Sequence, residues 1–163
     1  MAEMVTGANT EGILRQHSGF IIRTNFKGTL LDKDGKIKQV VHASNLVVTI
    51  GLQHIIDQLH SSPAQAKMSH YAIGTGTIAP AAVDTSLQTQ VYRKTLDSQS
   101  KSGVQITYIG AFSPGEGTGN ITEGGIFNAS SGGTMLARVV FTAVNKTASD
   151  TFIINHTITA SAV

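Results

Sequence analysis

The sequence predicts an all-β fold, mainly an antiparallel β-sandwich or jelly roll, with one short amphipathic helix and an extended N-terminal arm. Three observations support this prediction. Thr, Val and Ile are abundant, and branched side chains fit the pleated surface of a sheet. Apolar and polar residues alternate over many short stretches. Gly, Ser and Asp clusters separate these stretches every 8–15 residues or so, which gives about eight or nine strands.

The chain divides into an N-terminal arm, residues 1–18, and a single β-rich domain, residues 19–163. With 163 residues in all, one hydrophobic core is expected. The arm mixes Gly, Asn, Thr and Glu without a consistent period and contains the apolar pair Ile13-Leu14. Both a disordered terminus and a segment that orders on a neighbouring subunit fit this pattern.

The domain begins with a predicted strand and hairpin. Every second residue from Phe20 to Phe26 falls on one mostly apolar face, which predicts a strand. The Asp34-Gly35 pair is a strong hairpin signal, and Ile37 to Val41 is the returning strand. Asp32 and Asp34 also resemble the start of a calcium loop, but no acidic residue stands at the last ligand position of such a loop. A turn is therefore the preferred interpretation.

The predicted helix follows an apolar run from Asn45 to Ile50. Leu52, Ile55, Ile56 and Leu59 have the spacing of one helical face, which predicts a helix of about ten residues. A single amphipathic helix in a β-rich chain normally covers a sheet edge or an open end of the core.

The middle of the chain combines two short strands with a long connection. Strands are predicted from Met68 to Ile73 and from Val91 to Leu96. The segment from Gly74 to Gly76 lacks the third glycine, the lysine and the long helix of a phosphate loop, so a tight turn is preferred. Residues 77–90 form the longest irregular connection, and such loops often carry contacts. Ser98 to Gly103 is predicted to be a polar turn.

A hairpin and two further strands complete the domain. Alternation predicts strands from Val104 to Phe112 and from Phe152 to Thr159. Residues 113–120 are all turn formers and are predicted to be an exposed loop. Residues 121–144 are two apolar runs around a small-residue turn, which predicts a β-hairpin whose Gly132-Gly133 pair supplies positive φ angles.

Composition and spacing argue against a reaction centre. The absence of cysteine excludes disulfides, thiolate metal sites and a cysteine nucleophile. The six histidines lack metal-ligand spacing, and His156 shares a strand face with Phe152 and Ile154, so a hydrogen-bonded core or interface histidine is expected. Glu116 and Glu123 flank the glycine loop as a glycosidase pair would, but a sugar site would also want aromatic platforms, and the chain has no Trp and only three Tyr. We therefore expect no enzyme activity, no cofactor, no metal and no small-molecule substrate.

Charge limits the partners that the chain can have. The net charge is +2, with scattered Lys and Arg, which does not support a nucleic-acid groove. Charged residues make up 13% of the chain, about half the usual share, so the surface is expected to be covered in part by partners. The N-terminus lacks a basic and apolar leader, and no apolar run is long enough for a bilayer, so we expect a soluble chain made in the cytoplasm and no membrane partner.

Six short runs carry a resemblance that covers roughly residues 45–160. They are YAIGTGT from Tyr71, DTSL from Asp84, ITY from Ile106, GEGTG from Gly115, ITEGGIFNASSGGTMLARVVF from Ile121 and KTASDT from Lys146. This pattern resembles a domain of tailed-bacteriophage virion proteins, which are described as head decoration (cement) proteins or as tail and fibre components. The short chain and its arm are most like a capsid decoration protein.

The resemblance implies a structural protein without catalytic residues. Its expected place is the outer capsid surface of a virion, after synthesis in the bacterial host cytoplasm. There, a small β-domain, often a homotrimer, would bridge neighbouring major capsid proteins and hold them against internal DNA pressure. Two alternatives stay open: a tail, baseplate or fibre-attachment module, and a host-surface carbohydrate binder or depolymerase that uses residues 113–120.

Contact residues are predicted for two kinds of interface. Those predicted to contact the major capsid protein are Ile13, Leu14, Arg15 and Phe20. Those predicted for the contact between subunits are Phe127, Met135 and Arg138. Because Arg138 interrupts an apolar strand, it either points to solvent, which is the preferred interpretation, or pairs across an interface.

Overall fold

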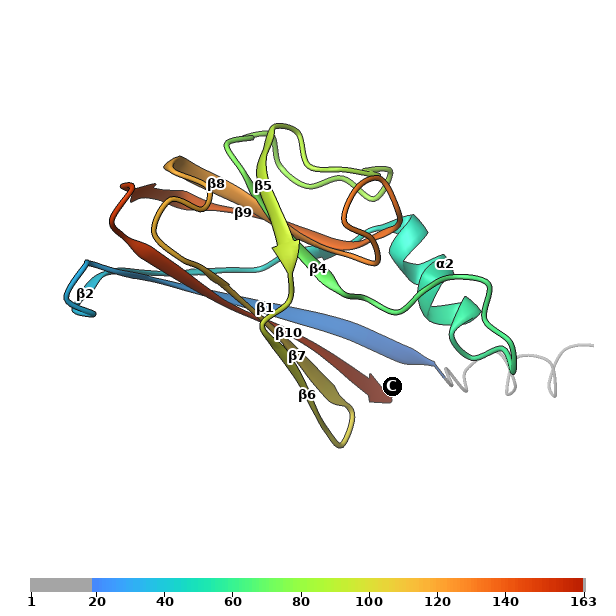
Figure 1. The fold of residues 1–163 in the computed structure, drawn as a ribbon. Coiled ribbons are helices and arrows are strands. Elements are labelled where there is room, and N and C mark those ends of the chain that lie inside the picture. The colour runs from blue at the N-terminus through green and yellow to red at the C-terminus, as the bar shows by residue number, and fades with distance from the viewer. Residues whose placement is uncertain (1–18, 163) are drawn as a thin grey trace, which may run out of the picture.

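The computed structural model describes residues 19–162, which form two five-stranded antiparallel sheets packed face to face, with one helix at one end (Figure 1). The prediction of an all-β sandwich with one short helix is confirmed, whereas the predicted arm lies outside the described residues. In chain order the elements are β1 (Phe20–Leu31), β2 (Ile37–Ala43), β3 (Leu46–Val47), α2 (Thr49–Asp57), β4 (His70–Gly74), β5 (Gln90–Thr95), β6 (Ser98–Ser102), β7 (Gln105–Phe112), β8 (Gly119–Phe127), β9 (Met135–Lys146) and β10 (Thr151–Ala162).

The two sheets differ in how their strands follow one another. Sheet A has the order β2-β1-β10-β7-β6, and sheet B has the order β3-β9-β8-β4-β5. In sheet A the first and last described strands are neighbours, and they pair along their whole length, from Phe20 opposite Ala162 to Leu31 opposite Thr151. The first and last strands of the described chain therefore lie side by side in the middle of sheet A.

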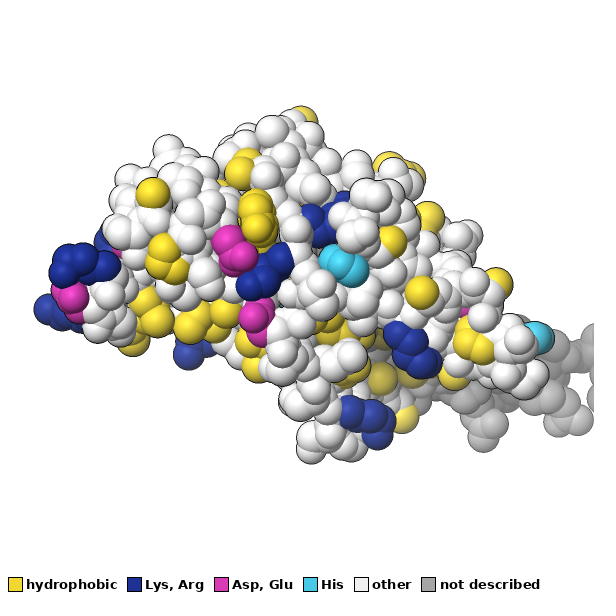
Figure 2. Space-filling model, in the orientation of Figure 1, with side chains coloured by type: hydrophobic (Ala, Val, Ile, Leu, Met, Phe, Trp, Pro, Cys, Tyr) yellow, Lys and Arg dark blue, Asp and Glu magenta, His cyan; other side chains and the backbone are white. Residues whose placement is uncertain are grey.

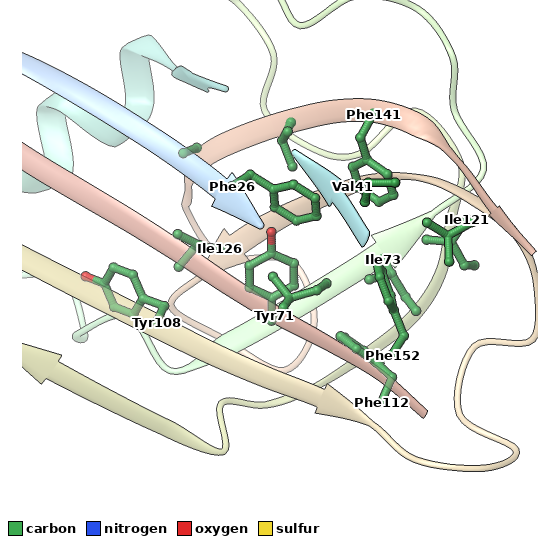
Figure 3. Packing of buried hydrophobic residues seen from close by; sticks show 14 of the residues in the cluster. Phe26, Val41, Tyr71, Ile73, Tyr108, Phe112, Ile121, Ile126, Phe141 and Phe152 are labelled. Atoms are coloured by element: carbon green, nitrogen blue, oxygen red, sulfur yellow. The ribbon is translucent and has the colours of Figure 1, made fainter. Parts of the chain in front are cut away.

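The main core lies between the sheets and follows the predicted alternation. Phe26 and Leu30 of β1 and Phe152 and Ile154 of β10 are buried on the inner face of sheet A. Figure 3 shows Phe26 and Phe152 among side chains of sheet B, and the ring of Phe26 stacks on that of Phe141 at a centroid distance of 4.6 Å. Such aromatic pairs add about 0.5–1.5 kcal/mol beyond the apolar area they bury.

Sheet B also buries its outer face. A second apolar cluster lies there, formed by Val48, Ala72, Leu87, Phe127 and Met135. Every residue of β8 from Ile121 to Phe127 is buried, because the main core covers one face and the connection that follows β4 covers the other. The predicted hairpin of residues 121–144 is confirmed as β8 and β9, and Gly132 and Gly133 have φ angles of 55° and 71°.

Segment 98–103 forms a strand rather than the predicted turn. The five residues of β6 are all exposed and pair with β7 from Ser98 opposite Ile109 to Ser102 opposite Gln105. Backbone pairing needs no apolar face, and polar residues with a lysine are typical of an edge strand that must avoid further pairing. The prediction was wrong because alternation reports only strands that bury one face.

Of the predicted apolar helix face, only Ile55 packs against the core. The buried residues of the helix are Gly51 and His54, whereas Leu52, Ile56 and Leu59 are 45%, 59% and 79% exposed. At Gly51 the helix backbone approaches the backbone carbonyl of Leu136 in β9 so closely that a Cβ atom would collide with it. The helix therefore contacts the sheet through its smallest residue, which leaves an apolar face exposed.

Gly51→Ala is expected to lower the free energy of unfolding by about 1–3 kcal/mol, the usual effect of overpacking. In a helix interior, replacing glycine by alanine ordinarily raises the stability by up to about 1 kcal/mol. The change expected at Gly51 is therefore opposite in sign to the one that helix propensity alone would give. Urea unfolding would measure the difference, with Gln53→Ala at an exposed helix position as the control. Equal or greater stability of the Gly51 variant would contradict the packing described here.

Candidate interaction surface

A buried ion cluster lies on the outer face of sheet B. Glu123 of β8 is fully buried and Arg138 of β9 is 2% exposed. The Nε and Nη2 atoms of Arg138 lie 3.0 and 2.9 Å from Oε2 of Glu123, and its Nη1 donates to Oδ2 of Asp84 at 2.9 Å. The hairpin places the first two side chains on neighbouring strands, and the connection after β4 brings the third.

The same cluster holds the connection between β4 and β5, residues 75–89. Oε1 of Glu123 accepts from the backbone N–H groups of Gly76 and Thr89 at 3.0 and 2.7 Å, and Oε2 accepts from Gln88 N–H at 3.0 Å. Arg138 also donates to the carbonyl oxygen of Ile78 at 3.0 Å. The Glu123 carboxylate and the Arg138 guanidinium are thus fully engaged in attaching this connection to the sheet.

The glycine at position 76 makes room for this carboxylate. A Cβ atom there would lie 2.5 Å from Oε1 of Glu123 and 2.5 Å from Cβ of Gln88. The segment that resembles a phosphate loop thus receives an anion from its own chain. The predicted tight turn is not formed, because β4 runs through Gly74 and residues 75–77 form no turn; the glycine at position 76 is needed for the space that the carboxylate takes.

The fixed connection presents two apolar side chains to solvent. Ile78 and Val83 are 64% and 82% exposed, whereas the backbone beside them is held by the ion cluster. Asp84, the one charged residue between positions 75 and 89, is already paired with Arg138. A surface of this kind costs little to desolvate, since it exposes no unpaired charge.

A larger apolar surface lies at the end of the sandwich where α2 packs. This surface, the apolar end, is formed by side chains that are between 45% and 79% exposed: Phe20, Leu52, Ile56, Leu59 and Val104. Figure 2 shows yellow apolar side chains over this end of the molecule, where α2 and the β6–β7 hairpin lie. Large apolar side chains gathered in this way are typical of contact surfaces.

A groove of about 480 Å³ opens at the apolar end, between α2 and the start of β7. The helix side is formed by His54, Ile55 and Leu59, and the sheet side by Val104, Ile106 and Tyr108, with Met68 and Leu136 among the other lining residues. Lys67 and Lys101 also line it, and no carboxylate does among the described residues. Burial raises the pKa of Tyr108 to about 12, so its hydroxyl stays neutral.

The predicted core histidine is confirmed. His156 is fully buried on the inner face of sheet A, and its Nδ1 lies 2.8 Å from the hydroxyl oxygen of Tyr71 in sheet B. Among the described residues its Nε2 has no hydrogen-bond partner, and burial lowers the pKa of His156 to about 3. The imidazole is therefore neutral and links the two sheets.

Of the two predicted contact sets, one can be placed in full and the other only at Phe20. Phe20 is 60% exposed and belongs to the apolar end, whereas Ile13, Leu14 and Arg15 lie outside the described residues. The three residues predicted for a subunit contact are internal to the protomer: Phe127, Met135 and Arg138 are 1%, 0% and 2% exposed. They have almost no surface to offer a partner, so that prediction is corrected.

The preferred interpretation of Arg138 as a solvent-facing residue is wrong for a reason that the sequence contains. Arg138 is the one charged residue between Met135 and Val144, and Glu123 is the one charged residue between Ile121 and Phe127. Opposite charges that stand alone on the two arms of one hairpin indicate an internal pair. The two carboxylates that were rejected as a glycosidase pair have other partners: Glu116 contacts Lys94 at 3.2 Å and the N–H of Ser113 at 2.9 Å, and Glu123 is paired with Arg138.

Residues 19–162 contain no group of three or more His, Cys, Asp or Glu side chains arranged to hold a metal ion. Within this range, no helix has both the length and the apolarity needed to cross a membrane. Comparison of the chain with protein-family models, curated proteins and solved structures finds no significant match.

Proposed function

We propose that this protein is a structural component of a tailed-bacteriophage particle, which decorates the outer capsid surface and stabilises it by bridging neighbouring major capsid proteins. The observation that carries the proposal is the apolar end, a contact surface built on a rigid sandwich. The proposal that the particle is a phage virion rests on the short runs that resemble phage virion proteins, such as the one from Ile121 to Phe141.

The surface fits close contact with a protein shell in two ways. First, charged residues are only 13% of the chain, so little charge must be stripped of water when the surface is covered. Second, a homotrimer would present three copies of the apolar end, and simultaneous seating raises avidity without tight single contacts. In this arrangement the protein acts by binding alone and needs no catalytic residue, cofactor or nucleic-acid partner.

The copy number in purified virions tests this assignment. Densitometry of a gel of the particles is expected to show hundreds of copies, as for a protein that covers a shell. A handful of copies would instead support the alternative function, a tail, baseplate or fibre-attachment module.

Ile56→Asp is expected to reduce the number of copies per particle at least about tenfold, because an unpaired charge covered at an interface costs more than 1.4 kcal/mol. Ile37→Asp is the matched control. Ile37 is 61% exposed against 59% for Ile56, but it lies by the β1–β2 turn at the opposite end of the sandwich (Figure 1). Equal occupancy of the two variants, with both folded, would remove the apolar end as the docking surface.

A further inference from the structure

The groove at the apolar end is an unfilled part of the hydrophobic core. Met68, Tyr108 and Leu136 line it and are at most 6% exposed, so its floor is already core. Val104 and Leu59 stand at its mouth and are 70% and 79% exposed. Its volume of about 480 Å³ falls within the range of small-ligand sites, roughly 300–1,000 Å³, and is enough for two aliphatic side chains.

The described part of the chain begins next to this groove. Phe20 and Ile22 of β1 line a neighbouring hollow together with Leu52, near the first turn of α2, whereas Leu59, after its last turn, lines the groove. Ile22 is paired with Ala160, whose N–H donates to the carbonyl oxygen of Val104. Because neighbouring strands are about 4.8 Å apart, Ile22 lies roughly 10 Å from Val104 across the sheet, and Gly19, three residues further along the chain at about 3.3 Å per residue, lies roughly 14 Å from it.

The residues before β1 have the right chemistry at the right distance. Ile13-Leu14 is an apolar pair, and five peptide units join Leu14 to Gly19, which span up to about 17 Å when extended. Glu11 stands two residues before the pair and Arg15 directly after it, so charge does not decide how the segment fits a groove lined by Lys67 and Lys101. Length and apolarity agree on one occupant.

We propose that Ile13 and Leu14 fill this groove in their own protomer. The segment then completes the core at the open end of the sandwich and covers Val104, Ile106 and Leu59. The outward face of α2, with Leu52 and Ile56, stays available for a partner. This inference concerns the isolated protein and stands whether or not the protein belongs to a virion.

Disulfide trapping tests the placement cleanly because the chain has no cysteine of its own. The full-length variant with Leu14→Cys and Val104→Cys is oxidised at low protein concentration and analysed by non-reducing electrophoresis. We expect an intrachain disulfide that forms about tenfold or more faster than in a control with Leu14→Cys and Lys33→Cys, because proximity raises the effective concentration of the two thiols. Lys33 is the matched control, since it is exposed but lies at the β1–β2 turn far from the groove.

A second pair, Leu14→Cys with Leu59→Cys, probes the helix side of the groove and is expected to behave like the first. Interchain disulfides, seen as dimers whose amount rises with concentration, would overturn the proposal in favour of the segment of a second copy. Equal oxidation rates in the test and control variants would overturn it as well, because the segment would then have no preferred place on the domain.

Discussion

Arg138→Met is expected to lower the free energy of unfolding by about 3–5 kcal/mol, a large part of the 5–15 kcal/mol typical of a domain. The loss arises from Glu123, which is fully buried and would lose its cation while still accepting three backbone N–H groups. Urea unfolding at neutral pH would measure the change. Hydrogen exchange adds a local readout, since the amides of Gly76, Gln88 and Thr89 should exchange faster once the connection 75–89 loosens.

The control for this experiment is Lys33→Met. Lys33 pairs with Asp34 at 2.9 Å, but both side chains are at least 70% exposed, and such pairs contribute little to stability. A double variant that also carries Glu123→Gln should be more stable than the sum of the two single changes implies, because the uncompensated charge is then absent. If Arg138→Met changed stability no more than Lys33→Met, the cluster would not hold the fold together.

Acidification from pH 6.5 to pH 5 is expected to cost about 2 kcal/mol of stability through His156 alone. The folded-state pKa of His156 is about 3, well below the value of about 6.5 for an unfolded chain, because burial opposes the charged imidazolium. In this window the unfolded chain therefore binds a proton that the folded protein does not. The contribution is complete above about pH 7.5, and the loss grows to about 4 kcal/mol near pH 3.

Urea unfolding across pH 5–7.5 measures this effect, with His156→Leu as the comparison, for which a flatter profile is expected. This pH range excludes the titration of Asp150. The hydrogen bond from Lys38 lowers the pKa of Asp150 to about 2, so this residue changes the stability only in stronger acid. A nitrogen-15 NMR titration of the imidazole adds a check that does not depend on stability. An unchanged slope in the variant, or an imidazole that titrates near pH 6.5, would contradict the neutral core histidine.

The sheets could be predicted because burying one face leaves a period in the sequence. The strands of sheet A that carry Phe26, Tyr108 and Ile154 alternate clearly, and the Asp34-Gly35 pair is a strong local signal for the turn, where Gly35 has a φ angle of 80°. By contrast, β6 buries nothing, so its pairing with β7 leaves no trace in hydrophobicity. A strand that is stabilised only by backbone hydrogen bonds cannot be predicted from the alternation of apolar and polar residues.

The surface was harder to predict than the core because it depends on close approaches between distant segments. The spacing of Leu52, Ile56 and Leu59 correctly predicts a helix, but the contact at Gly51 decides which way that face points. In the same way, Arg138 is internal only because Glu123 and Asp84 reach it from other segments. An apolar helical face shows amphipathicity, and only tertiary packing shows whether that face is covered.

The pairing of β1 with β10 has a consequence for synthesis. The strand that separates β1 from β7 is β10, the last of the described strands to be made, and twelve consecutive residues of β1 have their partners in it, from Thr151 to Ala162. Contacts between such distant segments form slowly, because the whole intervening chain must be present first. Sheet A can therefore close only after β10 has left the ribosome. A chain that terminates before Thr151 has no central strand for this sheet, so it stays open to proteases while complete chains fold.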